Sequence, residues 1–535
     1  MISPVSEREL AALAVALAGP DTPLTEAERK VATADSPPSP DVSRAVRRAI
    51  AGGADPLGEA FCRLRSPTTR RACGAIYTPR AIIDSMVKWA ARQNAPARIV
   101  DPGTGSGRFL LSAARMFPDA ELVAVEIDPL AALTLRANAS VLGLTERLSV
   151  LVEDYRTIDL AETGGPTLFL GNPPYVRHHG IAPEWKAWFA ETATSYGLKA
   201  SKLAGMHIHF FLKTRAIARQ GDYGAFVTSA EWLDVNYGEV MRRMLVDGLG
   251  GTAVHVIAPT AMPFTDTATT GAITCFRTGR DGDEVRFRAV DEIPKLGSLG
   301  GGRPVVRSRL EAAHRWSPFL RPAARVRSGR SELGELCRVH RGQVTGCNEA
   351  WIAGAYPGSL PDSVLVPSVT RARELFDARI DLLCADKLRR VIDLPIDLGV
   401  FDDDERAQIR EFLAWARSRG ADSSYVARNR RAWWAVGLRE PAPILATYMA
   451  RRPPAFVRNI CDARHLNIAH GIYPREPLSA GVLDALAEFL RGEVCMSAGR
   501  TYAGGLTKFE PRELERVPIP TLDDLNERAQ ALDAC

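Results

Sequence analysis

The stretch ARIVDPGTGSGRFLLSAARMF, residues 97–117, joins an apolar run to an amphipathic segment through a glycine-rich loop. The apolar run at 97–102 has the length and residue types of a buried strand, and residues 107–117 have the spacing of a helix. The loop between them contains Asp101, Gly103, Gly105 and Gly107. Because glycine lets a backbone turn tightly beside the positive end of a helix, the stretch predicts a ligand-binding loop. Nucleotide-binding domains of several classes share such a loop, so the loop alone does not identify the ligand.

The sequence on both sides of this loop alternates between short apolar runs and helical stretches. The apolar runs lie at 97–102, 121–128, 148–155, 167–174, 224–229, 253–258 and 272–277. Strands separated by helices of this length predict an α/β fold, with a mostly parallel sheet covered by helices on both faces. Ligands of such sheets bind at the carboxyl ends of the strands.

Two acidic residues close the next two predicted strands. Glu126 ends the second, where a carboxylate can accept hydrogen bonds from both hydroxyls of a ribose, and Ile127 follows it. Asp154 ends the third, where it can accept a hydrogen bond from an adenine amino group, and Tyr155 is expected to lie on the adenine ring. One acid alone would be interpreted as the cap of a strand end, but two in succession beside the glycine loop predict a site for an adenosine-containing cofactor.

The fourth predicted strand runs directly into Asn172, Pro173, Pro174 and Tyr175. The exocyclic nitrogen of an aromatic amine is a poor nucleophile because its lone pair is delocalised into the ring. The Asn172 side-chain oxygen and the Pro173 carbonyl can hold both N–H groups and so favour a pyramidal nitrogen. Pro174 stiffens the loop, and Tyr175 offers an aromatic face to a flat base extruded from its stack.

Residues of about 72–280 resemble the γ-group N6-adenine DNA methyltransferases of restriction–modification systems. The order of motifs carries the resemblance: a segment GAIYTP at 74–79, then the glycine loop, then NPPY. Carried over by position, Tyr77, Thr78 and Pro79 are expected to contact the methionine end of the cofactor. Phe264 falls where the family supplies a second aromatic surface against the flipped adenine, with a core phenylalanine as the other interpretation.

The resemblance implies a class I S-adenosylmethionine-dependent methyltransferase with a Rossmann-like, seven-stranded, mostly parallel sheet. It further implies methyl transfer from S-adenosylmethionine to N6 of a flipped-out adenine in double-stranded DNA at a specific site. The expected context is a restriction–modification or related phage-defence system, with a cognate restriction endonuclease or defence partner encoded separately.

We expect four regions along the chain. They are an N-terminal appendage at 1–65 that is partly disordered, a methyltransferase domain at 66–295, an Arg-rich linker at 296–330, and a mixed α+β target recognition domain at 331–535.

The last of these regions resembles TaqI-like specificity domains in its segments at 342–352, 465–474 and 504–520. A recognition domain needs cations for phosphates and side chains for base edges. The candidates for these contacts are Arg428, Arg430, Arg431, Arg451, Arg452 and Lys508. Each of them singly can also be a solvated surface charge.

Composition excludes several other classes of protein. The 535 residues carry a formal net charge of +5 and nine cysteines, without CxxC pairs or histidines at zinc spacing, so we expect no metal site. No apolar run is long enough to cross a bilayer, and the N-terminus lacks the order of a secretory signal, which predicts a cytoplasmic protein.

Four other classes of protein share some of these sequence features. NPPY also occurs in enzymes that methylate RNA or protein glutamine, which present the same planar nitrogen. Pro20, Asp21, Glu28 and Lys30 superficially resemble the metal-binding acids of a nuclease, but surface charge after a helix start accounts for them better. A binding protein with an inactive catalytic half is disfavoured because the motifs are intact. A C5-cytosine methyltransferase is excluded because it needs a cysteine nucleophile where Asn172 stands.

Overall fold

The computed structural model forms two compact units. It describes residues 4–32, 37–66, 78–258, 270–279, 282–320, 330–496, 499–501 and 506–533. The first unit contains the described residues up to 320 and the second those from 330 onward.

A nine-stranded sheet forms the centre of the first unit, in the strand order β3-β2-β1-β4-β5-β7-β6-β8-β9. The strands are β1 Arg98–Pro102, β2 Glu121–Val125, β3 Leu148–Leu151, β4 Thr167–Gly171, β5 Tyr223–Ser229, β6 Gly251–Ile257, β7 Gly271–Arg277, β8 Glu284–Val290 and β9 Arg303–Val306. β1 to β5 are parallel, and β7 runs antiparallel to both β5 and β6. The predicted α/β architecture is present, and the sheet has two strands more than the expected seven.

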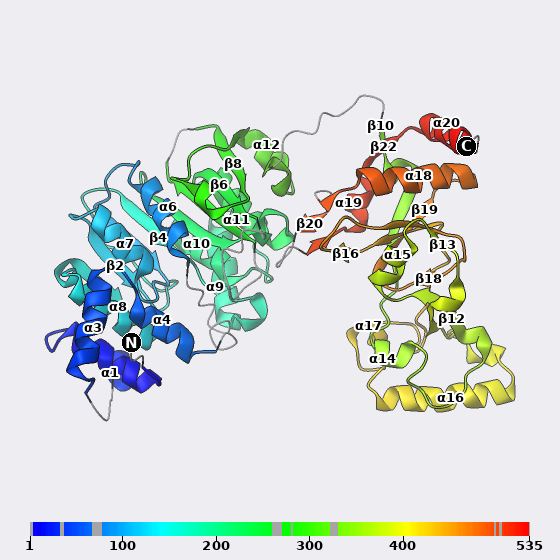
Figure 1. Ribbon diagram of the computed structural model, residues 1–535, viewed down its shortest axis with the longest axis horizontal. Coiled ribbons are helices and arrows are strands. Elements are labelled where there is room, and N and C mark those ends of the chain that lie inside the picture. Colours follow the sequence, from blue (N-terminus) through cyan, green and yellow to red (C-terminus); the bar gives the residue numbers. More distant parts are fainter. Residues whose placement is uncertain are drawn as a thin grey trace. The chain divides into compact units, whose positions relative to one another are not determined.

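Helices pack on both faces of this sheet (Figure 1). They are α6 Arg80–Ala90, α7 Arg108–Met116, α8 Pro129–Val141, α9 Pro183–Ser195, α10 Met206–Ile217 and α11 Glu239–Val246. β1 and β4 are buried along their whole length, because their apolar side chains are covered from both sides. The carboxyl ends of β1 to β4 share one edge of the sheet, which brings the loops that follow them together.

The N-terminal helices pack against α8 and are not an appendage. α1 Glu7–Ala18, α2 Glu26–Val31, α3 Pro40–Ala51 and α4 Pro56–Leu64 precede the sheet. Leucines of α1, Ile50 of α3 and Phe61 of α4 share one apolar core with α8. Part of residues 1–65 was expected to be disordered, but Pro40 occupies the first position of α3, where proline fits a helix.

Glu28 also has a structural role in this cluster. Its side chain is fully buried, caps α2 together with Thr25, and lies 2.6 Å from the guanidinium of Arg136 on α8. Lys30 pairs with Glu26 at 2.7 Å. Glu28 is thus a buried helix cap, where surface charge was expected, whereas Lys30 is an exposed surface charge; these contacts account for both residues without a nuclease site.

Residues 303–320 belong to the first unit, where an Arg-rich linker was expected. β9 pairs with β8, and α12 Arg307–Ala312 follows it. Val305, Leu310 and Trp316 are buried in the core on one face of the sheet. Arg307 donates hydrogen bonds to the carbonyl oxygens of Leu245 and Gly251, at 2.7 and 2.9 Å. This arginine therefore fastens the segment to the sheet.

The second unit is a mixed α+β fold built on several small sheets. The largest has five strands in the order β11-β19-β15-β17-β13, two others have three strands, β14-β12-β18 and β16-β21-β20, and β10 pairs with β22. Its strands are β10 Arg330–Glu332, β11 Cys337–Arg341, β12 Leu365–Val369, β13 Asp381–Leu382, β14 Arg389–Ile392, β15 Ile444–Thr447, β16 Met449–Ala450, β17 Phe456–Asn459, β18 Arg464–His465, β19 Ala469–Pro474, β20 Arg500–Thr501, β21 Thr507–Lys508 and β22 Pro518–Pro520. Its helices are α13 Leu333–Leu336, α14 Asn348–Trp351, α15 Ala372–Ala378, α16 Asp403–Ser418, α17 Tyr425–Arg428, α18 Ala480–Glu493, α19 Pro511–Glu515 and α20 Leu522–Asp533. Separate apolar cores under α18 and α16 hold this unit together.

Candidate active site

A cavity of about 300 Å³ opens where the loops after β1 to β4 meet. Its walls include nine of the residues predicted from the sequence: Thr78, Gly103, Gly105, Glu126, Ile127, Asp154, Tyr155, Asn172 and Pro174. Its size is at the lower end of the range for small-molecule sites. The fold thus gathers into one cavity predicted residues that are up to 96 positions apart in the sequence.

The glycine loop adopts the backbone conformation that its composition predicts. Gly103, Gly105 and Gly107 have φ values of +72°, +57° and +92°. These left-handed conformations are costly for any residue with a Cβ. Gly107 does not line the cavity but is the N-terminal capping residue of α7, where a Cβ would collide with Leu135.

Asp101 lies beneath the loop and not in the cavity. Its side chain is buried and accepts hydrogen bonds from the Thr104 hydroxyl at 2.9 Å and the Leu110 amide at 3.3 Å. Burial raises the pKa of Asp101 to about 7, although these two hydrogen bonds oppose the shift. Asp101 therefore shapes the loop from inside the protein.

Glu126 presents its carboxylate to the cavity from the end of β2. The amide of Gly105 donates to Oε2 at 2.8 Å, and the amide of Asp128 donates to Oε1 at 2.9 Å. Burial raises the pKa of Glu126, while the two backbone donors act in the opposite direction. The two donors fix the carboxylate, and the next residue, Ile127, leaves 65% of its side chain exposed beside it. A fixed acceptor next to an exposed apolar side chain suits a sugar joined to a flat ring.

Asp154 and Tyr155 line the cavity after β3, but each has a protein partner that the sequence did not predict. Arg156 binds both carboxylate oxygens of Asp154, with distances of 2.9 and 2.6 Å. Burial alone would raise the pKa of Asp154, but the hydrogen bonds from Arg156 outweigh it and hold that pKa below its usual value. Tyr155 is 2% exposed and its hydroxyl lies 2.9 Å from that of Thr214 on α10.

The amide of Asn172 is oriented by Thr78. Its nitrogen donates to the Thr78 hydroxyl at 3.0 Å, and this bond turns the amide oxygen to the other side. Pro174 lines the cavity together with Asn172, whereas Pro173, which lies between these two residues in the sequence, is buried. Tyr175 donates to the carbonyl of Val227 at 3.3 Å, and the ring stands edge-on to His207 with centroids 6.4 Å apart.

The segment before α6 is described in part. Thr78 lines the cavity, and Pro79 is the N-terminal capping residue of α6. Tyr77 and Phe264 lie outside the described residues.

Arg156, Met206 and Phe210 are among the residues of the cavity wall that sequence reasoning did not find. Met206 and Phe210 come from α10, and the ring of Phe210 packs on that of Tyr155 at 5.0 Å. Arg156 stacks its guanidinium over Trp185 at 3.8 Å in addition to holding Asp154. The sequence offered a signal for one of these three residues: Arg156 is a basic residue two positions after the predicted acid, Asp154.

The six predicted DNA-contacting residues differ in their surroundings. Arg428, Arg431, Arg451 and Arg452 are exposed, and Arg452 stacks on Phe376 at 3.5 Å. Arg430 is half-buried and donates to the carbonyl oxygens of Val344 and Trp433, which indicates a structural role. Lys508 is half-buried on β21.

Within the described residues, no group of three or more His, Cys, Asp or Glu side chains is arranged to hold a metal ion. The same residues include no helix that is both long and apolar enough to span a membrane.

Comparisons with protein families and curated proteins cover nearly the whole chain. Residues 55–182 match the model of N-6 DNA Methylase, residues 145–255 that of the Eco57I restriction-modification methylase, and residues 323–535 that of the C-terminal domain of Type II methyltransferase M.Eco57I. Type II methyltransferase M.XamI of Xanthomonas campestris pv. amaranthicola is 54% identical over 97% of this chain and 99% of its own length. Type II methyltransferase M.AccI of Acinetobacter calcoaceticus is 21% identical over 84% of this chain and 85% of its own length.

A shorter part of this chain is similar to a methyltransferase named for another substrate. The release factor glutamine methyltransferase of Mycolicibacterium smegmatis is 35% identical, but over 21% of this chain and 39% of its own length.

Among solved structures, the Type IIL restriction-modification enzyme MmeI in complex with DNA gives a TM-score of 0.60 at 14% identity, covering 99% of this chain and 82% of that one. A nuclease-deletion mutant of the Type ISP restriction-modification enzyme LlaGI gives 0.50 at 11% identity, with 98% and 62% covered. At these identities the similarity concerns the fold, and it agrees with the predicted class I architecture.

Proposed function

Because this chain belongs to the Type II adenine-specific DNA methyltransferases of restriction–modification systems, which use S-adenosylmethionine, we propose that the cavity after β1 to β4 is its active site. The observation that carries this proposal is the amide of Asn172, oriented by Thr78 at 3.0 Å beside a cavity that Glu126 and Asp154 also line. An oriented acceptor next to a nucleoside-sized cavity is what methylation of an amino nitrogen requires.

The residues of the cavity fit S-adenosylmethionine. Glu126 offers a fixed carboxylate to the ribose hydroxyls, and Ile127 an exposed apolar surface to the adenine ring. Gly103 and Gly105 have no side chain to obstruct the methionine end, which Thr78 flanks, with Pro79 directly after it at the start of α6. Asp154 keeps acceptor capacity for the cofactor's adenine amino group because each carboxylate oxygen has more than one lone pair. When bound, the cofactor supplies an electrophilic methyl group on a positively charged sulfur.

The Asn172 loop activates the target adenine of DNA. The Asn172 oxygen and the Pro173 carbonyl accept the two N–H groups of N6, which favours a pyramidal nitrogen with its lone pair directed at the methyl group. The nitrogen gains the methyl group and releases one proton to water, so no covalent enzyme intermediate forms. Because Asn172 lies at the end of β4, an adenine in a duplex has to leave its stack to reach it.

We further propose that the first unit carries out methyl transfer and that the second unit reads the DNA sequence. The match of residues 323–535 to the C-terminal domain of M.Eco57I supports this division. We also propose that the protein acts in the cytoplasm, and that a separately encoded endonuclease cuts the same sequence when it is unmethylated.

Methylation of RNA or of protein glutamine remains the alternative substrate class for the NPPY motif. The similarity to a glutamine methyltransferase covers 21% of this chain, whereas that to a Type II methyltransferase covers 97% and includes the second unit. DNA is therefore the substrate to test first.

The test uses purified protein, labelled S-adenosylmethionine and genomic DNA from a host without adenine methylation. We expect N6-methyladenine in the hydrolysed DNA and no transfer to tRNA or release factor. Asn172→Ala is expected to lower kcat roughly 10²–10³-fold, because it removes an acceptor of the reacting amino group. The dissociation constant of the cofactor is expected to stay within about twofold, since one hydrogen bond at most is lost there.

Asp154→Asn is the matched variant, in which we expect cofactor affinity to change. It keeps one oxygen for Arg156 but weakens the acceptor for the cofactor, so we expect cofactor affinity to fall by about tenfold, the equivalent of one charged hydrogen bond. Near wild-type turnover in Asn172→Ala, or unchanged cofactor affinity in Asp154→Asn, would contradict the assigned roles.

A further inference from the structure

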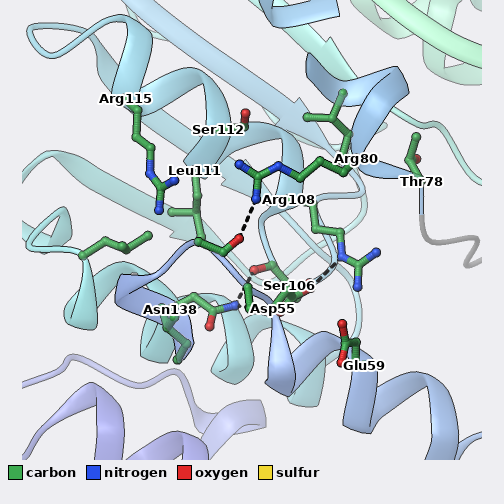
Figure 2. Close-up of a pocket in the computed structure, with 15 residues that line it drawn as sticks. Asp55, Glu59, Thr78, Arg80, Ser106, Arg108, Leu111, Ser112, Arg115 and Asn138 are labelled. Carbon is green, nitrogen blue, oxygen red and sulfur yellow. Dashed lines mark hydrogen bonds and ion pairs between the residues drawn. The ribbon is translucent and has the colours of Figure 1, made fainter. Parts of the chain in front are cut away.

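Asp55 joins the N-terminal helices to the glycine loop. It is the N-terminal capping residue of α4, and its side chain is mostly buried, with 17% of its surface exposed. Figure 2 shows Ser106, Arg108 and Asn138 around this carboxylate. Ser106 and Arg108 belong to the glycine loop and the start of α7, and Asn138 belongs to α8. One carboxylate thus contacts three segments of the catalytic unit.

The two oxygens of Asp55 have separate roles. Oδ1 accepts hydrogen bonds from the Gly58 amide at 2.9 Å and from the Asn138 side chain at 3.2 Å. Oδ2 accepts from the Ser106 hydroxyl and from Nε of Arg108, each at 2.6 Å. Oδ1 therefore caps α4, whereas Oδ2 holds the loop. Short bonds to an ionised carboxylate are stronger than those between neutral groups.

The contacts between Asp55, Gly58 and Ser106, here called the junction, are too close to admit a further atom. A Cβ at Gly58 would lie 2.1 Å from Oδ2 of Asp55 and 2.5 Å from Oγ of Ser106. Asn138 adds a second bond from the other side, to the backbone oxygen of Ser106 at 3.0 Å. The position of Ser106 is accordingly fixed through both its side chain and its main chain.

Ser106 and Arg108 connect this junction to the cofactor cavity. Both line that cavity, and both also line a neighbouring cavity of about 250 Å³ that Asp55 borders. The residue before Ser106 is Gly105, whose amide holds the Glu126 carboxylate at 2.8 Å. A displacement of Ser106 would therefore move the donor that orients Glu126.

We propose that Asp55 is a positioning residue for S-adenosylmethionine binding, which acts through Ser106 and Arg108 and makes the N-terminal helices part of the cofactor site. This rests on the proposed function of the cavity. Asp55 itself does not line the cofactor cavity, so its effect is on affinity for the cofactor and not on the chemical step.

The test compares variants that all keep a cap for α4. Asp55→Asn retains Oδ1 but places an NH₂ group against the Arg108 and Ser106 donors. Asp55→Ser is also a good N-terminal capping residue and removes the contacts to the loop without adding a donor. For both, we expect the dissociation constant of S-adenosylmethionine, measured by calorimetry without DNA, to rise by roughly tenfold, as for the loss of one or two charged hydrogen bonds. The KM for the cofactor should rise in parallel, while kcat at saturating cofactor stays within about twofold.

Glu28→Gln is the matched control. It weakens the buried pair with Arg136, which also fastens the N-terminal helices to α8 but does not contact the loop. We expect it to lower Tm while leaving cofactor affinity unchanged.

Wild-type cofactor affinity in Asp55→Asn and Asp55→Ser would overturn the proposal. An equal loss of affinity in Glu28→Gln would overturn it too, because the effect would then follow general stability. If the wild-type protein itself bound no S-adenosylmethionine, the proposed function of the cavity would fail, and that outcome is distinct from both.

Discussion

Gly107→Ala tests whether the glycine loop is held in place by its backbone geometry. Gly107 is the N-terminal capping residue of α7 and has φ at +92°, a conformation that residues with a side chain rarely adopt. A Cβ at this position would also lie 2.3 Å from Cδ1 of Leu135 and 3.1 Å from the side chain of Leu111. Leu135 is fully buried in the core and cannot move away without disturbing it, whereas Leu111 is buried but also borders the cavity of about 250 Å³.

The expected cost follows from two separate effects. A residue with a Cβ in the left-handed region costs about 1–2 kcal/mol. Forcing a methyl group into a packed core adds about 1–3 kcal/mol. The sum is roughly 2–5 kcal/mol, which lowers Tm by roughly 5–10 °C in a domain of this size.

Gly143→Ala separates the two effects. Gly143 has φ at +69° just after α8, but a Cβ there would meet nothing within 4 Å. It should therefore show the conformational cost alone, and a smaller loss of Tm. Thermal unfolding followed by circular dichroism gives both values, and calorimetry gives the affinity for S-adenosylmethionine, which we expect to fall in Gly107→Ala but not in Gly143→Ala. Equal Tm values for the two variants would refute the packing part of the reasoning.

Two further predictions concern charge. Burial raises the pKa of Asp101 to about 7 from an ordinary value near 4, so between these pH values the folded protein holds a proton that the unfolded chain has released. The contribution of Asp101 to the free energy of unfolding should therefore fall as pH rises from about 4 to 7, and Asp101→Asn should reduce the slope over this range in urea titrations; parallel profiles would contradict it. In the second unit, the exposed Arg451 and Arg452 should contribute to DNA binding through phosphates, so the double alanine variant should weaken binding to all sequences and reduce the salt slope by about 1–2. Arg430→Gln, which loses contacts to backbone carbonyls, should lower Tm instead, and an unchanged salt slope in the double variant would remove these arginines from the interface.

The core of the site could be predicted from the sequence because its signals are local. Strand, turn and helix follow one another within 97–117, and each acid or amide of the site comes directly after an apolar run. Once parallel strands are inferred, the residues after their carboxyl ends must share one edge of the sheet. For this reason Glu126, Asp154 and Asn172 could be assigned to one cavity without knowledge of any contact.

Local signals also misled where a residue's partner is distant or a pattern is ambiguous. An Arg-rich segment after glycines resembles a linker. Arg307, however, donates hydrogen bonds to carbonyl oxygens some 56 to 62 residues earlier in the chain. Arg430 was predicted to contact DNA, and the sequence did not indicate that its guanidinium also donates to the carbonyl oxygen of Val344, 86 residues away. The sequence shows which groups a charged side chain can bind. The fold shows whether a group of the protein already binds that side chain.

The N-terminal region combines both difficulties. Its helices are short, and most of their apolar side chains cover α8, so nothing in the segment alone shows that it has a partner. Asp55 lies 51 and 53 residues before the two loop side chains that it holds, and an aspartate before a proline is an ordinary helix start in any sequence. The capping of α4 by Asp55 was therefore predictable, but its hydrogen bond to Ser106 was not. That bond uses Oδ2, the carboxylate oxygen that the cap leaves available.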